Sequence, residues 1–157
     1  MIQFKSGLGK KEASTIQSII VDLVDTYRDF YITKNNLRLF IQDNFDVLLD
    51  CLKKGDKIAF DSFGVAIVTG YSDNSPRKYL KILTKDLKDV DQLLKIVYWN
   101  VKEDLFCKVK NTNPLKDILL KGGFTFIGGR GKEVLLMHKA IEQRESTYKN
   151  FSKDKDE

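Results

Sequence analysis

Only a few residues in this sequence are of types that could bind a metal ion or act as a nucleophile. Histidine occurs once, as His138, and cysteine occurs twice, as Cys51 and Cys107. Neither cysteine belongs to a C-x-x-C pair and no second histidine accompanies His138, so the pattern does not predict a metal site. We interpret the cysteines as reduced, partly buried thiols. For His138 we favour a structural or surface role, and a general-base role stays open.

Two short basic segments could contact phosphate groups. The segment 128–132, Gly-Gly-Arg-Gly-Lys, could cradle a phosphate with its backbone amides. It lacks the spacing of a P-loop and the Ser or Thr that follows one, so we interpret it as a hairpin turn. The second segment holds the cations Arg77, Lys78, Lys81 and Lys85. Because Asp86 and Asp89 follow directly, we interpret it as a solvated sheet edge.

The single tryptophan, Trp99, could stack on a base or anchor a protein partner. It follows Tyr98, which continues an apolar helical face. We therefore expect Trp99 to pack in the core or at its edge.

Apolar periodicity predicts helices alternating with strands over most of the chain. We expect helices at 16–27, from residue 33 or 35 to the glycine at 55, at 90–101 and at 114–121. We expect strands at 29–32, 57–60, 65–69, 79–84, 105–109, 124–127 and 133–138. Residues 61–64 and 128–131 are predicted turns, and residues 1–9 are expected to be flexible. This order favours a mixed α/β (α+β) sheet with helices packed on its faces.

The closing part of the chain resembles a known enzyme family. A predicted strand ends near Asn113, a short helix covers residues 115–121, and Gly123-Phe124 leads into a hairpin with an apolar last strand. This order is similar to the closing third of the GNAT N-acetyltransferases. The resemblance is sharper over residues 104–140 and extends in element order alone over residues 29–100.

The resemblance implies a mostly antiparallel central sheet with helices on both faces and a splay between its fourth and fifth strands. It also implies acetyl-CoA as the cofactor of any active member. If acetyl-CoA binds, the residues that match the family's contacts are Leu80, Ile82, Leu83, Asn111 and Asn113. The resemblance assigns no catalytic residue.

The chain departs from the family in the two places that matter most for catalysis. The family holds the cofactor pyrophosphate on a glycine-rich loop before its third helix, but this chain has no glycine between Tyr71 and Lys121. Asp86 and Asp89 stand there instead, and we expect their carboxylates to cap the helix amides and repel a diphosphate. Many members carry a Tyr that acts as the general acid at the position where this chain has Leu119. These departures predict a degenerate, non-catalytic member.

Length and composition predict one domain at residues 1–141, followed by a charged, flexible tail at residues 142–157. With no apolar run long enough for a membrane span and no signal-peptide pattern, we expect a cytoplasmic protein. The net charge of +5 permits an acidic partner without requiring one. The abundance of Lys, Asn and Ile suits a bacteriophage or an AT-rich bacterium, and in a phage the domain could be a virion or assembly component.

Three functions follow in order of preference. The first is a catalytically silent acetyltransferase-like domain that binds a protein partner or forms a homo-oligomer, with no cofactor. The second is an active acetyl-CoA-dependent N-acetyltransferase with an atypical pyrophosphate loop. The third is a nucleic-acid-binding regulator.

Overall fold

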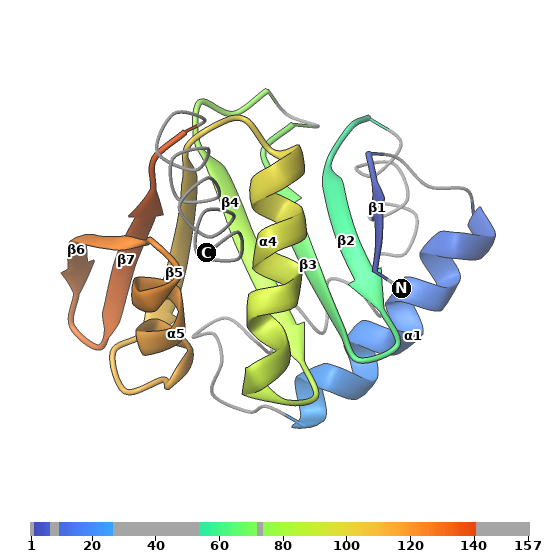
Figure 1. Ribbon diagram of the computed structural model, residues 1–157, viewed down its shortest axis with the longest axis horizontal. Helices are drawn as coiled ribbons and strands as arrows, with labels where there is room; N and C mark the ends of the chain where they lie inside the picture. Colours follow the sequence, from blue (N-terminus) through green and yellow to red (C-terminus); the bar gives the residue numbers. More distant parts are fainter. Residues whose placement is uncertain (1, 7–9, 27–53, 72–73, 141–157) are drawn as a thin grey trace, which may run out of the picture.

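The computed structural model describes residues 2–6, 10–26, 54–71 and 74–140 of the 157-residue chain. A single seven-stranded sheet runs through these residues, with α1 on one face and α4 and α5 on the other (Figure 1). The elements are β1 (Gln3–Lys5), α1 (Lys10–Thr26), β2 (Lys57–Asp61), β3 (Gly64–Thr69), β4 (Lys78–Thr84), the 3-10 helix η1 (Leu87–Asp89), α4 (Val90–Asn100), β5 (Leu105–Lys110), α5 (Leu115–Lys121), β6 (Thr125–Arg130) and β7 (Glu133–His138).

The strand order is β1-β2-β3-β4-β5-β7-β6, and all neighbours are antiparallel except β4 and β5, which are parallel. Short hairpins join β2 to β3 and β6 to β7, whereas the parallel step from β4 to β5 needs α4 as a crossover. The expected fold class, a mixed and mostly antiparallel sheet with helices on both faces, is confirmed.

Helical periodicity places the apolar faces of α1 and α4 against opposite sides of the sheet. In α4 the residues Val90, Leu93, Leu94 and Val97 are buried, which is the i, i+3, i+4, i+7 spacing of one helical face. The helix expected at 16–27 is confirmed as α1, Lys10–Thr26. It begins earlier than expected, and Ala13, three residues before Ile16, continues its buried face. No helix among the described residues combines the length and the apolar character needed to cross a membrane.

The start of the chain differs from the expectation. Residues 3–5 are not a loose end but the edge strand β1, which pairs antiparallel with β2 from Gln3 opposite Phe60 to Lys5 opposite Ile58. Three residues carry too little local signal to be recognised, and the free edge of β2 supplies the missing hydrogen-bond partners. The strand expected at 29–32 and most of the helix expected up to the glycine at 55 lie outside the described residues, as does the tail at 142–157.

The last hairpin has a shorter turn than the sequence suggested. Gly128 and Gly129 belong to β6, and Glu133 pairs with Arg130, so only residues 131 and 132 form the turn. A register shift between Phe126 and Gly128 makes a β-bulge in this edge strand. A side chain at Gly129 would meet the backbone oxygen of Glu133 at 2.5 Å, so this glycine allows close strand approach.

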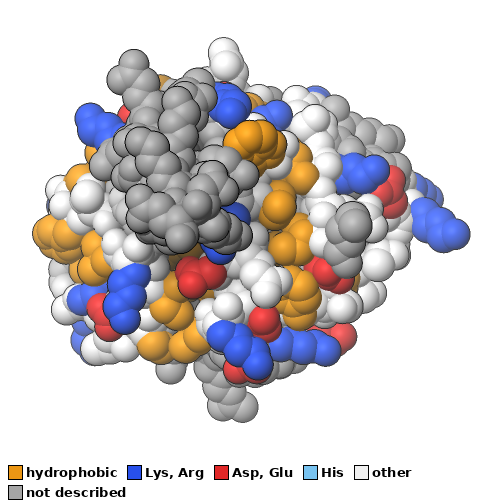
Figure 2. Space-filling view, in the orientation of Figure 1, with side chains coloured by type: hydrophobic (Ala, Val, Ile, Leu, Met, Phe, Trp, Pro, Cys, Tyr) orange, Lys and Arg blue, Asp and Glu red, His pale blue; other side chains and the backbone are white. Residues whose placement is uncertain are grey.

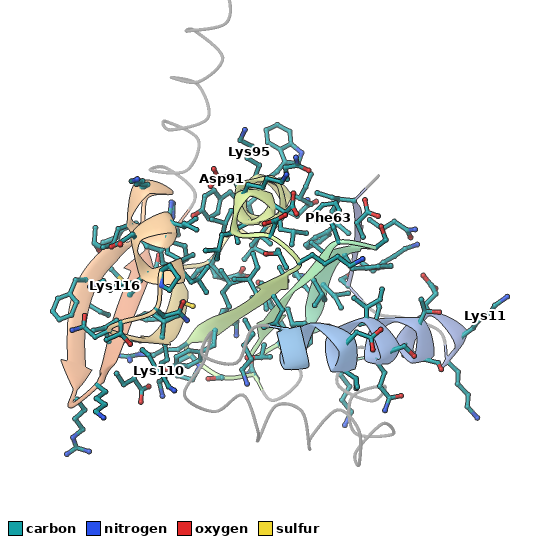
Figure 3. The ribbon with its side chains drawn as sticks, turned by 90° about the horizontal axis from the view of Figure 1, so that it is seen from below. Lys11, Phe63, Asp91, Lys95, Lys110 and Lys116 are labelled. Atoms are coloured by element: carbon teal, nitrogen blue, oxygen red, sulfur yellow. The ribbon has the colours of Figure 1, made fainter. Side chains whose placement is uncertain are left out.

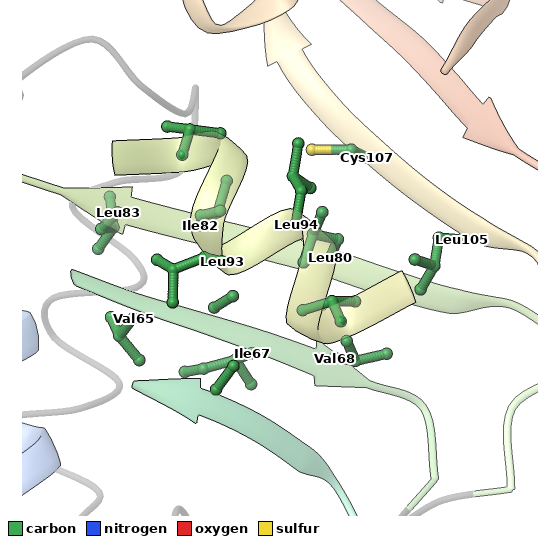
Figure 4. Close-up of a cluster of buried hydrophobic side chains, with 14 of the residues drawn as sticks. Val65, Ile67, Val68, Leu80, Ile82, Leu83, Leu93, Leu94, Leu105 and Cys107 are labelled. Atoms are coloured by element: carbon green, nitrogen blue, oxygen red, sulfur yellow. The ribbon is translucent and has the colours of Figure 1, made fainter. Parts of the chain in front are cut away.

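The core includes side chains on both faces of the sheet: residues of α4 and the strands (Figure 4) and, from α1, Ala13 and Ile16. Leu80, Ile82, Leu93 and Leu105 are at most 1% exposed. Cys107 is buried in the same core as a free thiol. Burial raises the pKa of Cys107 to about 12, while nearby Lys81 acts to lower it. The thiol is therefore a neutral core residue, as expected from the sequence.

We predict that Gly123→Ala destabilises the protein by about 2–3 kcal/mol. Gly123 ends α5 with φ of +103°, and an added Cβ would lie 2.6 Å from Nε2 of His138. The His138 ring cannot move away easily, because its centroid lies 4.3 Å from the ring centroid of Tyr98 and 5.3 Å from that of Phe124. Urea unfolding measures the effect. The matched control is Gly128→Ala, where a Cβ meets nothing within 4 Å. Equal stability of both variants would contradict this reading.

We predict that Cys107 makes stability fall as pH rises above 9.0, its ordinary pKa. Above that pH the unfolded thiol loses its proton while the folded thiol keeps it up to about 12, so the unfolded state is favoured. The free energy of unfolding should drop by up to about 1.4 kcal/mol per pH unit relative to Cys107→Val. The lowered pKa of Lys81 acts in the opposite direction; its main cause, burial, is common to both proteins, whereas the coupling between Lys81 and Cys107 is lost in the variant. Urea titrations below and above pH 9 that stay parallel for the two proteins would refute the prediction.

Candidate functional site

β4 and β5 touch at only one end and then separate. Their parallel pairing consists of Lys78 opposite Leu105 and Tyr79 opposite Phe106. Beyond these two pairs the ribbons diverge toward their carboxyl ends (Figure 4). We call the wedge between residues 80–84 of β4 and 107–110 of β5 the V. Among the described strands, β4 and β5 pair at these two positions alone, which makes the V the natural candidate site.

The backbone of β4 shows which residues face the V. The amide of Lys85 donates to the carbonyl of Phe63 at 2.8 Å, so Lys85 and every second residue before it direct their amides toward β3. Leu80 and Ile82, two of the predicted cofactor residues, therefore turn their backbone groups toward the V. Leu83, a third one, turns its backbone toward β3.

Buried apolar side chains lie on the side of the V that carries α4 and α5. Leu94 is 2% exposed and points toward fully buried Cys107 in Figure 4. Leu94 also lies against the end of α5, since a Cβ on Gly122 would be 3.3 Å from its Cδ1. Leu115 and Leu119, the buried residues of α5, belong to the same apolar core. All four side chains are thus withdrawn from solvent.

The helix start beside the V is satisfied by backbone oxygens. The amide of Asp89 donates to the carbonyl of Asp86 at 3.1 Å, and that of Val90 donates to the carbonyl of Leu87. The hydroxyl of Thr84 donates to the carbonyl of Asp86 at 2.6 Å. The expected side-chain caps are wrong, because neither Asp86 nor Asp89 makes a side-chain cap hydrogen bond. The 3-10 turn η1 supplies backbone carbonyls as acceptors for these amides, so the amides need no carboxylate acceptor.

The charges at this helix start remain unfavourable for a diphosphate. Asp86, Asp89 and Asp91 surround the first turn of α4, and none of the residues there is a glycine. The Lys88 ammonium lies 4.0 Å from the Asp86 carboxylate, but both groups are well exposed, so this pair is weak. Carboxylates beside a helix start oppose the attraction that its amides exert on an anion. This helix start therefore combines three carboxylates with the absence of glycine.

At the end of β5 the two predicted asparagines differ in accessibility. Asn113 is 3% exposed, and its side-chain oxygen accepts from the amide of Leu115 at 2.9 Å, which closes the first turn of α5. Asn111 is exposed, and its side-chain oxygen accepts from the ammonium of Lys116 at 2.9 Å. Both residues stabilise the strand-to-helix turn. Their assignment to a cofactor, like that of Leu80, Ile82 and Leu83, stays a prediction.

The histidine and one carboxylate that could serve acid–base chemistry both have partners within the protein. His138 is buried, with Nδ1 donating to the carbonyl of Lys139 at 3.0 Å, and it stacks on Tyr98. Asp61 lies on the β2–β3 hairpin, where a hydrogen bond from the amide of Ser62 holds its pKa below the usual range. Within the described ranges, no three potential metal ligands gather in one place.

Two side chains occupy positions that the sequence reading missed. Trp99 is 61% exposed, so the expectation of core packing is wrong. Trp99 follows Tyr98, the last residue of the apolar face, and one residue turns a helix by about 100°. This position could have indicated that Trp99 is exposed. Lys81 is half-buried, and β4 is an inner strand, so the expected solvated sheet edge is also wrong. Only the strand order could reveal this.

No family model and no curated protein matches the sequence. Among solved structures, the chain is similar to the PaiA N-acetyltransferase of Thermoplasma acidophilum in complex with coenzyme A, with TM-score 0.61, 16% identity and coverage of 88% of this chain and 99% of that one. It is also similar to an N-acetyltransferase of Staphylococcus aureus, with TM-score 0.54, 14% identity and coverage of 88% and 97%. At these identities the likeness establishes the fold: the chain has the fold of the GNAT N-acetyltransferases.

Proposed function

We propose that this protein is a catalytically silent member of the GNAT fold that acts as a binding or structural module. The observation that supports the proposal best is the burial of the apolar side chains on the α4 and α5 side of the V. Leu94, Cys107, Leu115 and Leu119 are at most 2% exposed, so they offer no open wall to a pantetheine chain. A ligand would have to displace packed side chains and break contacts that each buried residue contributes to stability.

The electrostatics of the α4 start support the same proposal. A diphosphate would be placed among Asp86, Asp89 and Asp91. Like charges within a few ångströms disfavour binding, and the loop side chains keep a ligand from the close backbone approach that glycine allows. Leu119 adds a third argument, because an aliphatic side chain cannot protonate a departing thiolate.

A protein partner is the occupant that we propose for the module. Four large apolar side chains are exposed on the described surface, and they come from α4, α5 and the edge strand β6: Trp99, Leu120, Phe126 and Ile127. Tryptophan and phenylalanine are common anchors of protein interfaces. A homo-oligomer is a second form of the same proposal. The bacteriophage origin and virion role stay predictions that the recovery of the chain in stoichiometric amounts from particles would support.

One observation favours the alternative, an active acetyl-CoA-dependent enzyme. The V is retained although its lining is packed, and solved structures of this fold include the acetyl-CoA complex of YncA from Salmonella typhimurium, with TM-score 0.50, 11% identity and coverage of 90% of this chain and 95% of that one. If acetyl-CoA bound here, the inner edge of β4 at Leu80 and Ile82 would be the backbone facing it.

The nucleic-acid alternative has less support on the face that carries α4. There, basic side chains are interspersed with acidic and apolar ones and do not form a continuous patch (Figure 2). Tight phosphate binding needs a dense positive surface. This hypothesis therefore ranks third.

We predict that isothermal titration calorimetry with acetyl-CoA gives no binding heat up to millimolar cofactor. The physical reason is the combination of packed side chains in the V and carboxylates at the start of α4. A chain of the same fold that binds coenzyme A, such as the PaiA enzyme from Thermoplasma acidophilum, is the positive control. Saturable binding at micromolar acetyl-CoA would contradict the proposal and favour the active acetyl-CoA-dependent enzyme.

A companion variant tests whether negative charge or side-chain packing prevents acetyl-CoA from binding. In the variant Asp86→Asn, Asp89→Asn, Asp91→Asn, the repulsion is removed and the V packing is kept. We expect it to remain silent with acetyl-CoA, because neutral amides do not open the V. Binding by this variant alone would show that charge, and not packing, excludes the cofactor.

A further inference from the structure

The face of β4 and β5 that lies opposite α4 is rich in cations and aromatic rings. A side chain at Gly64 would meet Thr84 and Leu93, so the even-numbered residues of β4 face α4 and the odd-numbered ones face away. Tyr79 pairs with Phe106. Phe106 and Lys108 therefore lie on the same face of the sheet as Tyr79 and Lys81, the face opposite α4. In Figure 3, Lys95 of α4 and Lys110 at the end of β5 mark the two opposite sides of the sheet.

Aromatic rings hold two of these cations in place. The Lys108 ammonium lies 5.2 Å from the ring centre of Tyr79, and the Arg77 guanidinium lies 4.7 Å from that of Phe106. The two rings are 5.9 Å apart, which joins the contacts into one cluster. Ring faces attract cations without neutralising their charge, so the positive potential persists.

Lys81 is the member of the cluster that carries an energetic cost. It is half-buried, and burial lowers its pKa; Cys107 acts to raise that pKa and Lys108 acts to lower it. Among the residues that the structure describes, no carboxylate forms an ion pair with Arg77, Lys81 or Lys108. A partly desolvated ammonium beside a second one is unfavourable unless an anion lies between them.

We propose that Arg77, Lys81 and Lys108 form a binding site for a small anion with phosphate or carboxylate oxygens. The three cations supply charge-assisted donors of the kind that bind such groups. Phe106 is only 8% exposed and its ring carries Arg77, so the site is built for the anionic group and offers little ring surface for a stacked base. The same charges disfavour polycationic ligands. The site lies on the other side of the sheet from the start of α4, so it is independent of acetyl-CoA binding.

The test is calorimetry and thermal unfolding of the full chain with three probes: inorganic phosphate, inorganic pyrophosphate and citrate, at ionic strength held constant with sodium chloride. We expect saturable binding and a raised melting temperature with at least one probe. A preference for pyrophosphate or for citrate identifies the phosphate or the carboxylate as the group recognised. Lys81→Met and Lys108→Gln should each weaken binding about tenfold, which corresponds to about 1.4 kcal/mol.

A second readout separates a binding role from a structural one. Without any anion, Lys81→Met should melt at a higher temperature than the unchanged protein, because the variant no longer buries a charge. The same variant should lose the stabilisation by the anion. Lys108→Gln, which replaces an exposed residue, carries the test where Lys81→Met does not fold.

The controls are Lys88→Gln at the start of α4 and Lys95→Gln on the outer side of that helix, and both should bind like the unchanged protein. If Lys88→Gln lost binding and Lys81→Met kept it, the anion would bind at the start of α4 and the proposal would be wrong. If all variants responded equally, the effect would be ionic screening and not binding at this site. The absence of saturable binding by any probe would also reject the proposal. Salt-dependent binding of a dT oligonucleotide without binding of the small probes would replace it by nucleic-acid recognition.

Discussion

Parallel strands can exchange hydrogen bonds only while they run side by side, and β4 and β5 do so over two residue pairs. Everything around the V follows from that short contact. Once the strands separate, the space between them must be filled, because an empty wedge would leave apolar walls without contacts. Leu94 from α4, Cys107 from β5 and the buried leucines of α5 belong to the apolar core on this side of the sheet. The sheet remains continuous at one end, where the two strands pair.

The same strand pair separates charges of opposite sign. Because side chains alternate across a strand, the even-numbered residues of β4 face α4, while the opposite face presents Lys81 and, from β5, Lys108. The aspartates at the start of α4 follow directly after β4 in the chain, so negative charge gathers at the carboxyl end of the strand and positive charge on the face opposite α4. A fold and the charges placed on it are separable properties of a protein.

Several polar contacts that could have belonged to a ligand stabilise the scaffold instead. Asn113 closes the first turn of α5, Thr84 bonds to the carbonyl of Asp86, and the hydroxyl of Tyr98 donates to the carbonyl of Gly122 at 2.8 Å. The last of these connects α4 to the end of α5, where Gly123 makes room for the His138 ring. Buried polar groups that are satisfied within the protein fix the relative positions of the two helices.

The sequence by itself determined the local elements: the helical face of α4, the β2–β3 hairpin, the Pro-Leu start of α5, the absence of glycine before α4 and the leucine at position 119. Those features depend on side-chain period and turn chemistry within a few residues, so they can be read directly. Tertiary structure alone decided that residues 3–5 join the sheet, that Lys81 lies on an inner strand, that Trp99 is exposed and that backbone carbonyls serve the amides expected to bind aspartates. Each of these depends on which distant segment packs alongside, and that is set by contacts between residues far apart in the chain, which no local pattern encodes.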